Sequence, residues 1–248
     1  MMHPQEQVIG ILGGMGPAAT ADFYTKLVGR TQARRDQDHP CTVIWSDPTI
    51  PDRTQAILGL GEDPTPWMLR GVRHLEDAGA TLIAVPCNTA HAFVPALQAK
   101  TNVPILHMIE ETVELLFAAG IRKVGLLATT GTCRMGLYQG FADARGLQVL
   151  VPDSTVQEKV MEGILKIKGG NASSEVGRRL AGAAARLQTQ GAQAVIAGCT
   201  EIPLALSQEM LRIPLIDPTG VLADAALRQS GFPLQGPGPE TGSAVLRM

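Results

Sequence analysis

Two cysteines in this chain each come just after an apolar run and just before a polar residue. Cys87 follows the run 81–85 and one proline, and Cys199 follows the run 194–197 and one glycine. A buried free cysteine is most often a small hydrophobic core residue, so either one alone says little about chemistry. Thiols are also weak acids, with a reference pKa of about 8.5, and can move protons near neutral pH.

The two cysteine segments match each other along the chain. Residues 79–89 align with residues 191–201 at a constant offset of 112, and this alignment superimposes the cysteines. Further matches pair 103–106 with 213–216 and 8–12 with 123–127. Self-similarity on this scale predicts two structurally equivalent halves. If the halves face each other across a cleft, the two thiols lie on opposite sides of whatever binds there.

A pair of opposed thiols is suited to inverting a carbon centre. Each cysteine begins a strand-to-helix loop, where backbone N–H groups and the helix dipole favour the thiolate. A thiolate on one face can remove a proton from a carbon, and a thiol on the other face can return one. After one turnover the two protonation states are exchanged.

The segments that must position these loops alternate between strands and helices. Continuous apolar runs indicate strands buried on both faces, which is typical of a parallel sheet. The expected strands are 8–12, 42–45, 81–85, 104–106, 123–127, 148–151, 194–197 and 213–216. Apolar stripes at helical spacing lie between them, at Met68, Val72 and Leu75 and at Val176, Leu180, Ala184 and Leu187. The pattern predicts a doubly wound α/β fold with ligands at the carboxyl ends of the strands.

The repeat and the alternation together predict two domains. The first comprises residues 1–107 plus 217–248, so that a C-terminal helix and tail complete it, and the second comprises residues 108–216. Residues 231–248 are rich in Gly and Pro and are expected to form a loose tail.

Composition excludes several classes of partner. The chain has 248 residues, 45% of them hydrophobic, and a formal net charge of -2, which gives no electrostatic reason to expect nucleic acid or an anionic membrane. No apolar run approaches the ~20 residues that span a bilayer, and residues 1–7 lack a signal-peptide pattern, so a cytoplasmic protein is expected. The four cysteines lack metal-ligand spacing, and a reducing compartment argues against disulfides.

Six motifs in order resemble the aspartate racemase branch of the aspartate/glutamate racemase family. They are Gly13–Pro17, Arg35–Pro40, Ile50–Thr54, Pro86–His91, Ala128–Thr132 and Ala197–Glu201, and the resemblance runs from about Val8 to about Arg228. It implies two pseudo-symmetric α/β domains, each with a mainly parallel sheet, and an active site in the cleft between them. It also implies racemisation without pyridoxal phosphate, metal or any other cofactor, and a homodimer.

By this resemblance Cys87 and Cys199 are the catalytic acid–base residues. Asn88, Thr89 and Thr200, which adjoin the thiols, resemble the family's binders of the amino-acid head of the substrate.

The second carboxylate of an acidic substrate requires cationic partners. Arg53 resembles the family residue that holds a substrate carboxylate with its planar fork. Lys168 resembles its counterpart in the other half, and Lys166 is the alternative.

The glycine-rich loop after the first strand has two interpretations. Gly14, Met15 and Gly16 fit the beginning of a dinucleotide-binding fingerprint, but Asp36 and Asp47 are both poorly placed as its acidic partner. The favoured interpretation is that backbone amides at this helix N-terminus approach a substrate carboxylate.

The equivalent loop of the second half contains Thr129, Thr130 and Thr132. Thr130 and Thr132 are predicted substrate binders, with helix capping as the alternative role of these threonines. Glu201 is predicted to tune the Cys199 thiol or to orient the substrate ammonium, and the alternative is that it only caps a helix.

The remaining candidates are expected to be structural. His91 and His107 lack a serine or metal partner at useful spacing, and Cys41 is expected in the core. Cys133 begins a helix, so its thiol is expected to be moderately acidic without being catalytic.

The sequence therefore predicts a racemase of a small acidic amino acid, with aspartate as the first choice of substrate and glutamate as the second. The alternatives are a related cysteine-dependent isomerase or decarboxylase of a small dicarboxylic acid, and an amino-acid-binding protein without catalysis.

Overall fold

The computed structural model describes residues 6–236, which form two compact units. One unit contains residues 6–111 and 219–236, and the other contains residues 112–218. The first boundary falls within helix α5 (Met108–Ala118). That the halves are independent domains stays a prediction, and the end of the predicted tail, residues 237–248, lies outside the described residues.

The sheet of the first unit is parallel, with strand order β2-β1-β3. Its strands are β1 (Val8–Gly13), β2 (Cys41–Ser46) and β3 (Leu82–Ala84). Ile83 also forms a single parallel bridge to Ile105, so the strand expected at 104–106 is reduced to one bridge. The helical segments are α1 (Pro17–Arg30), η2 (Asp36–Asp38), α2 (Arg53–Ile57), α3 (Thr65–Asp77), η3 (Thr89–Ala92), α4 (Val94–Gln98) and α10 (Pro218–Gln229).

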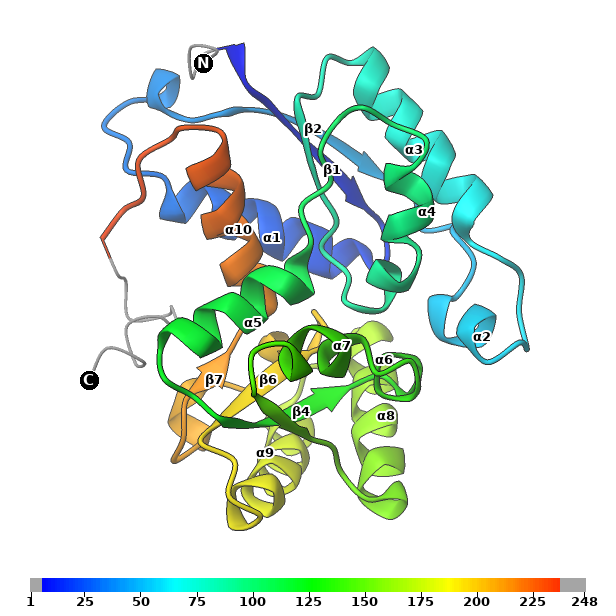
Figure 1. The fold of residues 1–248 in the computed structure, drawn as a ribbon, viewed down its shortest axis with the longest axis vertical. Helices are drawn as coiled ribbons and strands as arrows, with labels where there is room; N and C mark the ends of the chain where they lie inside the picture. The colour runs from blue at the N-terminus through cyan, green and yellow to red at the C-terminus, as the bar shows by residue number, and fades with distance from the viewer. Residues whose placement is uncertain (1–5, 237–248) are drawn as a thin grey trace. The chain divides into compact units, whose positions relative to one another are not determined.

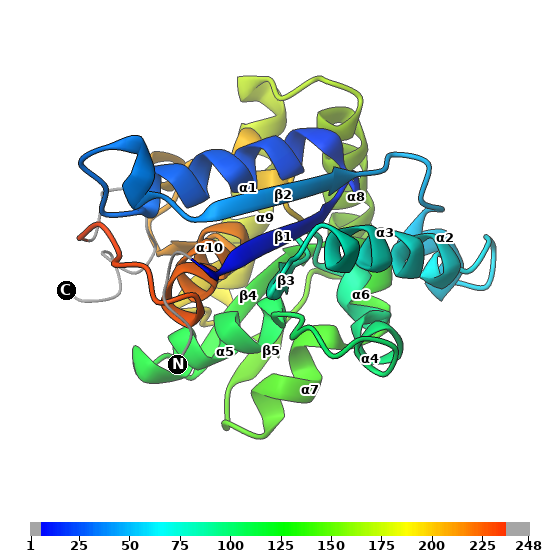
Figure 2. The same ribbon diagram turned by 90° about the horizontal axis from the view of Figure 1, so that it is seen from above.

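Both faces of this sheet are covered, which explains its continuous apolar strands. Ile9 and Ile11 of β1 pack with residues of α1 and α10, whereas Leu12 packs with residues of α3 and α4. Figure 1 shows α1 and α10 on one side of β1 and α3 and α4 on the other, and Figure 2 shows the paired strands β1 and β2 side by side. The helical stripe predicted at Met68, Val72 and Leu75 lies in this core, so this part of the prediction is confirmed.

The sheet of the second unit is also parallel, with strand order β5-β4-β6-β7. Its strands are β4 (Lys123–Ala128), β5 (Gln148–Leu150), β6 (Ala194–Gly198) and β7 (Leu215–Ile216). The helical segments are α6 (Thr130–Arg134), α7 (Leu137–Asp143), α8 (Ser154–Lys168), α9 (Ser174–Thr189), η4 (Ile202–Leu204) and η5 (Gln208–Met210).

One face of this second sheet forms a core with α8 and α9. Leu127, Val195 and Ala197 from the sheet contact this apolar cluster, to which α8 contributes Val160 and α9 contributes Leu180. Figure 1 shows α8 and α9 together on one side of the sheet and α7 on the other. The chain therefore has the predicted α/β fold class, with two parallel sheets flanked by helices.

The strand order repeats between the sheets as the sequence offsets predict. In each unit the first strand along the chain, β1 or β4, lies between the next two strands along the chain. These two strands are β2 and β3 in the first unit and β5 and β6 in the second. The bridge between Ile83 and Ile105 has its counterpart in the pairing of Val195 with Leu215. The internal repeat is therefore a repeat of topology and register.

Two local expectations were wrong. Cys41 is exposed, because it is the first residue of an edge strand rather than part of the core. The beginning of the tail is not loose, because Leu234 forms an antiparallel bridge with Thr31 and Phe232 is buried among α10 residues.

No helix among residues 6–236 is both long enough and apolar enough to cross a membrane.

Candidate active site

The Cys87 loop directly follows β3 and is buried. The side chains of Cys87, Asn88 and Thr89 are at most 6% exposed, and Thr89 begins the short helix η3. The Cys87 thiol packs with apolar residues of α3 and α4. The strand end therefore presents a thiol, an amide and a hydroxyl in sequence, as predicted.

His91 fixes this loop to the start of α5. Its Nδ1 lies 2.9 Å from the Cys87 carbonyl oxygen, and its Nε2 accepts a hydrogen bond of 3.0 Å from the Met108 N–H. Complete burial, together with the charge of His107, lowers the pKa of His91 to about 4. The ring is therefore neutral at pH 7, and its proton is on Nδ1, which donates to Cys87. These two backbone partners account for His91 without a chemical role.

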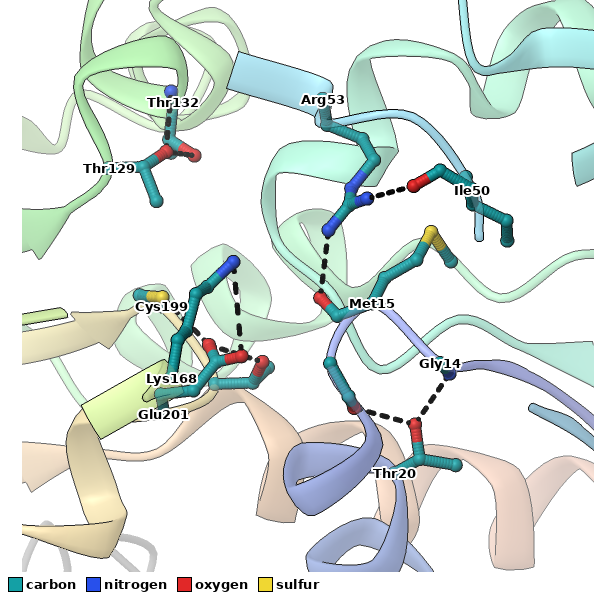
Figure 3. Close-up of polar contacts among 12 residues, drawn as sticks. Gly14, Met15, Thr20, Ile50, Arg53, Thr129, Thr132, Lys168, Cys199 and Glu201 are labelled. Carbon is teal, nitrogen blue, oxygen red and sulfur yellow. Dashed lines mark hydrogen bonds and ion pairs between the residues drawn. The ribbon is translucent and has the colours of Figure 1, made fainter. Parts of the chain in front are cut away.

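Arg53 is buried among backbone carbonyls. Its Nη1 donates to the carbonyl of Ile50 at 3.0 Å, and its Nη2 donates to the carbonyl of Met15 at 3.3 Å (Figure 3). Its Nη1 also donates to the carbonyl of Pro51 at 2.9 Å. Its buried Nε–H has no hydrogen-bond partner, and no ion pair within residues 6–236 includes Arg53. A buried guanidinium without a counter-charge is suited to binding an anion.

The glycine loop after β1 is held by Thr20. The Gly14 N–H donates to Thr20 Oγ1, and this hydroxyl donates to the Gly16 carbonyl, both at 2.9 Å (Figure 3). Gly14 has φ +89°, and a Cβ there would lie 2.4 Å from the backbone of Asp47. Close packing therefore requires the glycine, and its amide already has an acceptor. Sequence reasoning missed Thr20, although its spacing, one helical turn after Gly16, was a usable signal.

Asp47, one candidate acid for a dinucleotide site, has other partners. Its carboxylate accepts hydrogen bonds from Thr49, at 2.6 and 2.9 Å, and pairs with Arg70 at 3.1 Å. The hydrogen bond from the Thr49 hydroxyl lowers the pKa of Asp47. This carboxylate therefore organises the end of β2.

In the second unit the Cys199 loop contains a buried carboxylate. Cys199 Sγ donates a hydrogen bond of 2.9 Å to Glu201 Oε2, and Thr200 Oγ1 donates to the same oxygen at 3.3 Å. All three side chains are at most 5% exposed. Glu201 therefore contacts the Cys199 thiol directly (Figure 3), and its role in the reaction stays a prediction.

The structure separates the two candidate lysines. Lys168 ends α8, and its Nζ lies 4.0 Å from Glu201 Oε1. Lys166 pairs instead with Glu162 at 2.9 Å on the exposed side of the same helix. Lys168 is therefore the lysine that lies beside the second cysteine.

The surroundings of Cys199 favour the thiol. Burial raises the pKa of Cys199 well above 9, the charge of Glu201 raises it further, and Lys168 partly opposes this shift. The loop position alone predicted a stabilised thiolate, and for Cys199 this expectation was wrong. The buried carboxylate and the loss of solvent outweigh the helix dipole here.

The threonine loop after β4 caps a helix. Thr129 is the N-cap of α6, and its hydroxyl accepts a hydrogen bond of 3.2 Å from the Thr132 N–H. Thr132 is fully buried, and the Thr130 N–H donates to the sulfur of Met161 at 3.4 Å. Substrate contacts of Thr130 and Thr132 stay predictions. The expectation of an acidic Cys133 thiol was wrong, because burial raises the pKa of Cys133 to about 12.

Within residues 6–236, no cluster of three or more histidine, cysteine or acidic side chains could hold a metal ion.

Comparison with known proteins identifies relatives along most of the chain. Residues 12–226 match the family model described as Asp/Glu/Hydantoin racemase. The broad specificity amino-acid racemase RacX of Bacillus subtilis is 31% identical over 224 residues, which cover 89% of this chain and 96% of RacX. The Picrophilus torridus aspartate racemase structure superimposes with a TM-score of 0.84 and 33% identity, covering 92% of this chain and 96% of that one.

A more distant structure shares the fold alone. Glutamate racemase from Francisella tularensis superimposes with a TM-score of 0.68 at 18% identity, covering 98% of this chain and 95% of that chain.

Proposed function

Because the chain belongs to the Asp/Glu/hydantoin racemase family and is an amino-acid racemase, we propose that it racemises an acidic amino acid through Cys87 and Cys199. Aspartate is the first substrate in this proposal and glutamate the second. The reaction uses neither pyridoxal phosphate nor a metal, and the working form is a homodimer.

The observation that carries the acidic substrate is the buried guanidinium of Arg53. Three carbonyls accept its hydrogen bonds, whereas its Nε–H has no acceptor and its positive charge has no ion-pair partner in the part of the chain that the structure describes. A buried donor without an acceptor costs about 1–3 kcal/mol, and a substrate carboxylate would remove this cost. Lys168 supplies a second cation in the other unit, beside the Cys199 loop.

The chemistry requires the two thiols to reach opposite faces of one α-carbon. In one direction the thiolate of Cys87 forms an S–H bond with the α-proton, and the C–H bond breaks to leave a carbanion. The S–H bond of Cys199 then breaks as its proton adds to the opposite face of that carbon. One proton enters and one leaves, so the product is the enantiomer and the cysteine protonation states are exchanged.

The breadth of substrate acceptance is open to measurement. Aspartate and glutamate differ by one methylene, worth only about 1–3 kcal/mol in a pocket. The Bacillus subtilis relative is described as having broad specificity. Assays should therefore include glutamate and neutral amino acids beside aspartate.

The test is cofactor-free incubation with L-aspartate in deuterated buffer, followed by chiral chromatography and mass analysis. Wild type should release D-aspartate with deuterium at the α-carbon, and Cys87→Ser and Cys199→Ser should not. Cys133→Ser is a matched control, because it removes a partly buried thiol that has no role in the proposal. Absence of exchange with acidic and neutral amino acids would overturn the proposal.

The same samples test the alternatives. An amino-acid-binding protein would bind aspartate without exchange of its α-proton, and would keep that binding in both cysteine variants. A decarboxylase or isomerase of a dicarboxylic acid would change the mass or connectivity of its substrate rather than its chirality. Sedimentation of wild type at assay concentration tests the homodimer.

A further inference from the structure

The internal repeat is broken at one chemically decisive position. The alignment that superimposes Cys87 and Cys199 pairs Thr89 with Glu201. The residue two positions after the cysteine is therefore neutral in one unit and a carboxylate in the other. Both side chains are buried, so water screens the charge of the Glu201 carboxylate only weakly.

The carboxylate contacts the thiol directly. Glu201 Oε2 accepts the hydrogen of the Cys199 thiol at 2.9 Å, and the second oxygen, Oε1, has no hydrogen-bond partner and lies 4.0 Å from Lys168 Nζ. Ionising Cys199 would remove this hydrogen bond and place two negative groups in contact. Glu201 and Lys168 are the charged groups that act on the Cys199 thiol, which also belongs to an apolar cluster with residues of β6, α8 and α9.

From this geometry we propose that Glu201 is a positioning residue that keeps the proton on Cys199 in the resting enzyme. Cys199 is then an acid in the resting enzyme. The inference rests on the proposed function and deepens it, because it assigns a resting protonation state to one of the two thiols. Lys168 partly offsets the charge of Glu201, so it limits the bias.

The ratio of kcat/KM in the two directions of racemisation does not report this preference for a protonated Cys199. Two enantiomers are equally stable in water, so kcat/KM must be the same in both directions whatever form the resting enzyme takes. The reactivity of each thiol in the absence of substrate reports the resting state directly, because only the thiolate is alkylated.

The experiment is timed iodoacetamide alkylation of the full chain from about pH 6.5 to pH 10, with each cysteine followed by peptide mass analysis. In Glu201→Gln the alkylation profile of Cys199 should move to lower pH, with a rate at about pH 8 that is at least about 10-fold above wild type. Cys87 in the same molecules is the internal control and should keep its wild-type profile. An unchanged Cys199 profile in folded Glu201→Gln would overturn the inference.

Three further variants separate charge from packing. Glu201→Asp keeps the charge and should keep Cys199 slow, whereas Lys168→Gln removes the offsetting cation and should make Cys199 slower still. Lys166→Gln is the matched control, because Lys166 pairs with Glu162, and it should leave the profile unchanged. If Glu201→Gln does not fold, the Lys168→Gln result decides: slowing supports the inference and no change overturns it.

This test fails separately from the racemase proposal. Alkylation needs no substrate, so a shifted Cys199 profile would stand even if wild type exchanged no α-proton. Conversely, an active racemase with an unchanged profile would overturn only the role of Glu201.

Discussion

The loops that carry Cys87 and Cys199 have the same place in their sheets but different immediate surroundings. The Cys87 loop is fixed by a neutral imidazole, since His91 binds the Cys87 carbonyl and the first N–H of α5. The Cys199 loop instead places a carboxylate on the sulfur itself. A duplicated fold thus preserves the position of a thiol while its neighbours determine how readily that thiol ionises.

The sharpest way to break this difference is to make the Cys87 loop resemble the Cys199 loop. Thr89→Glu places a carboxylate at the repeat position of Glu201. A negative charge beside Cys87 should repel the negative charge that its sulfur carries in the proposed reaction, and we expect kcat/KM to fall by about 100-fold or more at pH 8. Chiral assay of aspartate measures the loss.

Thr89→Gln is the control for size, because it has the shape of glutamate without the charge. It should lose markedly less activity than Thr89→Glu, with circular dichroism used to confirm that both variants fold. Equal activity of the two variants would show that charge beside Cys87 is unimportant.

The imidazole that fixes the Cys87 loop should make the protein sensitive to acid. The folded pKa of His91 is about 4 and the unfolded value is about 6.5, so the unfolded chain binds the additional proton between these values. The stabilisation is complete above about pH 6.5 and is lost as pH falls toward 4. We expect His91 to account for about 2 kcal/mol of lost unfolding free energy between pH 7.5 and pH 5.

Urea unfolding of wild type and His91→Gln at several pH values measures this contribution. The variant should be less stable at pH 7.5 and should lose less stability on acidification. If both proteins lose the same free energy, His91 does not titrate as the structure requires.

The guanidinium site of the first unit should be sensitive even to a substitution that keeps its charge. Arg53 is held by three carbonyls, so Arg53→Lys removes a planar fork that one ammonium cannot replace. We expect kcat/KM for aspartate to fall about 10- to 100-fold. Arg70→Lys is the control, since Arg70 is an exposed partner of Asp47 in the same unit, and it should stay within about threefold of wild type.

Much of this arrangement could be predicted from sequence, and the parts that could not have a common cause. Apolar runs predicted the strands because both faces of each sheet are covered. The repeat predicted two equivalent halves, and in the structure the pairing of Ile83 with Ile105 has a counterpart at Val195. An apolar run does not reveal which strand lies at an edge, so Cys41 was wrongly expected in the core.

Interactions between distant segments account for the other differences. The hydrogen bond that Arg53 donates to the Met15 carbonyl joins two loops that are far apart in the chain. The raised pKa of Cys199 depends on burial and on the direction of the Glu201 side chain, neither of which a motif specifies. Sequence thus predicted which residues follow these strands better than it predicted the protonation of the Cys199 thiol.

The smallest expected effect concerns the loops that follow the central strands β1 and β4. After β1, the Thr20 hydroxyl reaches back from α1 to the Gly14 amide, whereas after β4, Thr129 itself caps α6. Thr129→Ala should remove one capping hydrogen bond and cost about 1 kcal/mol of unfolding free energy. Thr129→Ser keeps the hydroxyl and should retain most of that stability. If Thr129→Ser is as unstable as Thr129→Ala in urea unfolding, packing of the Thr129 methyl group, rather than the cap, stabilises this loop.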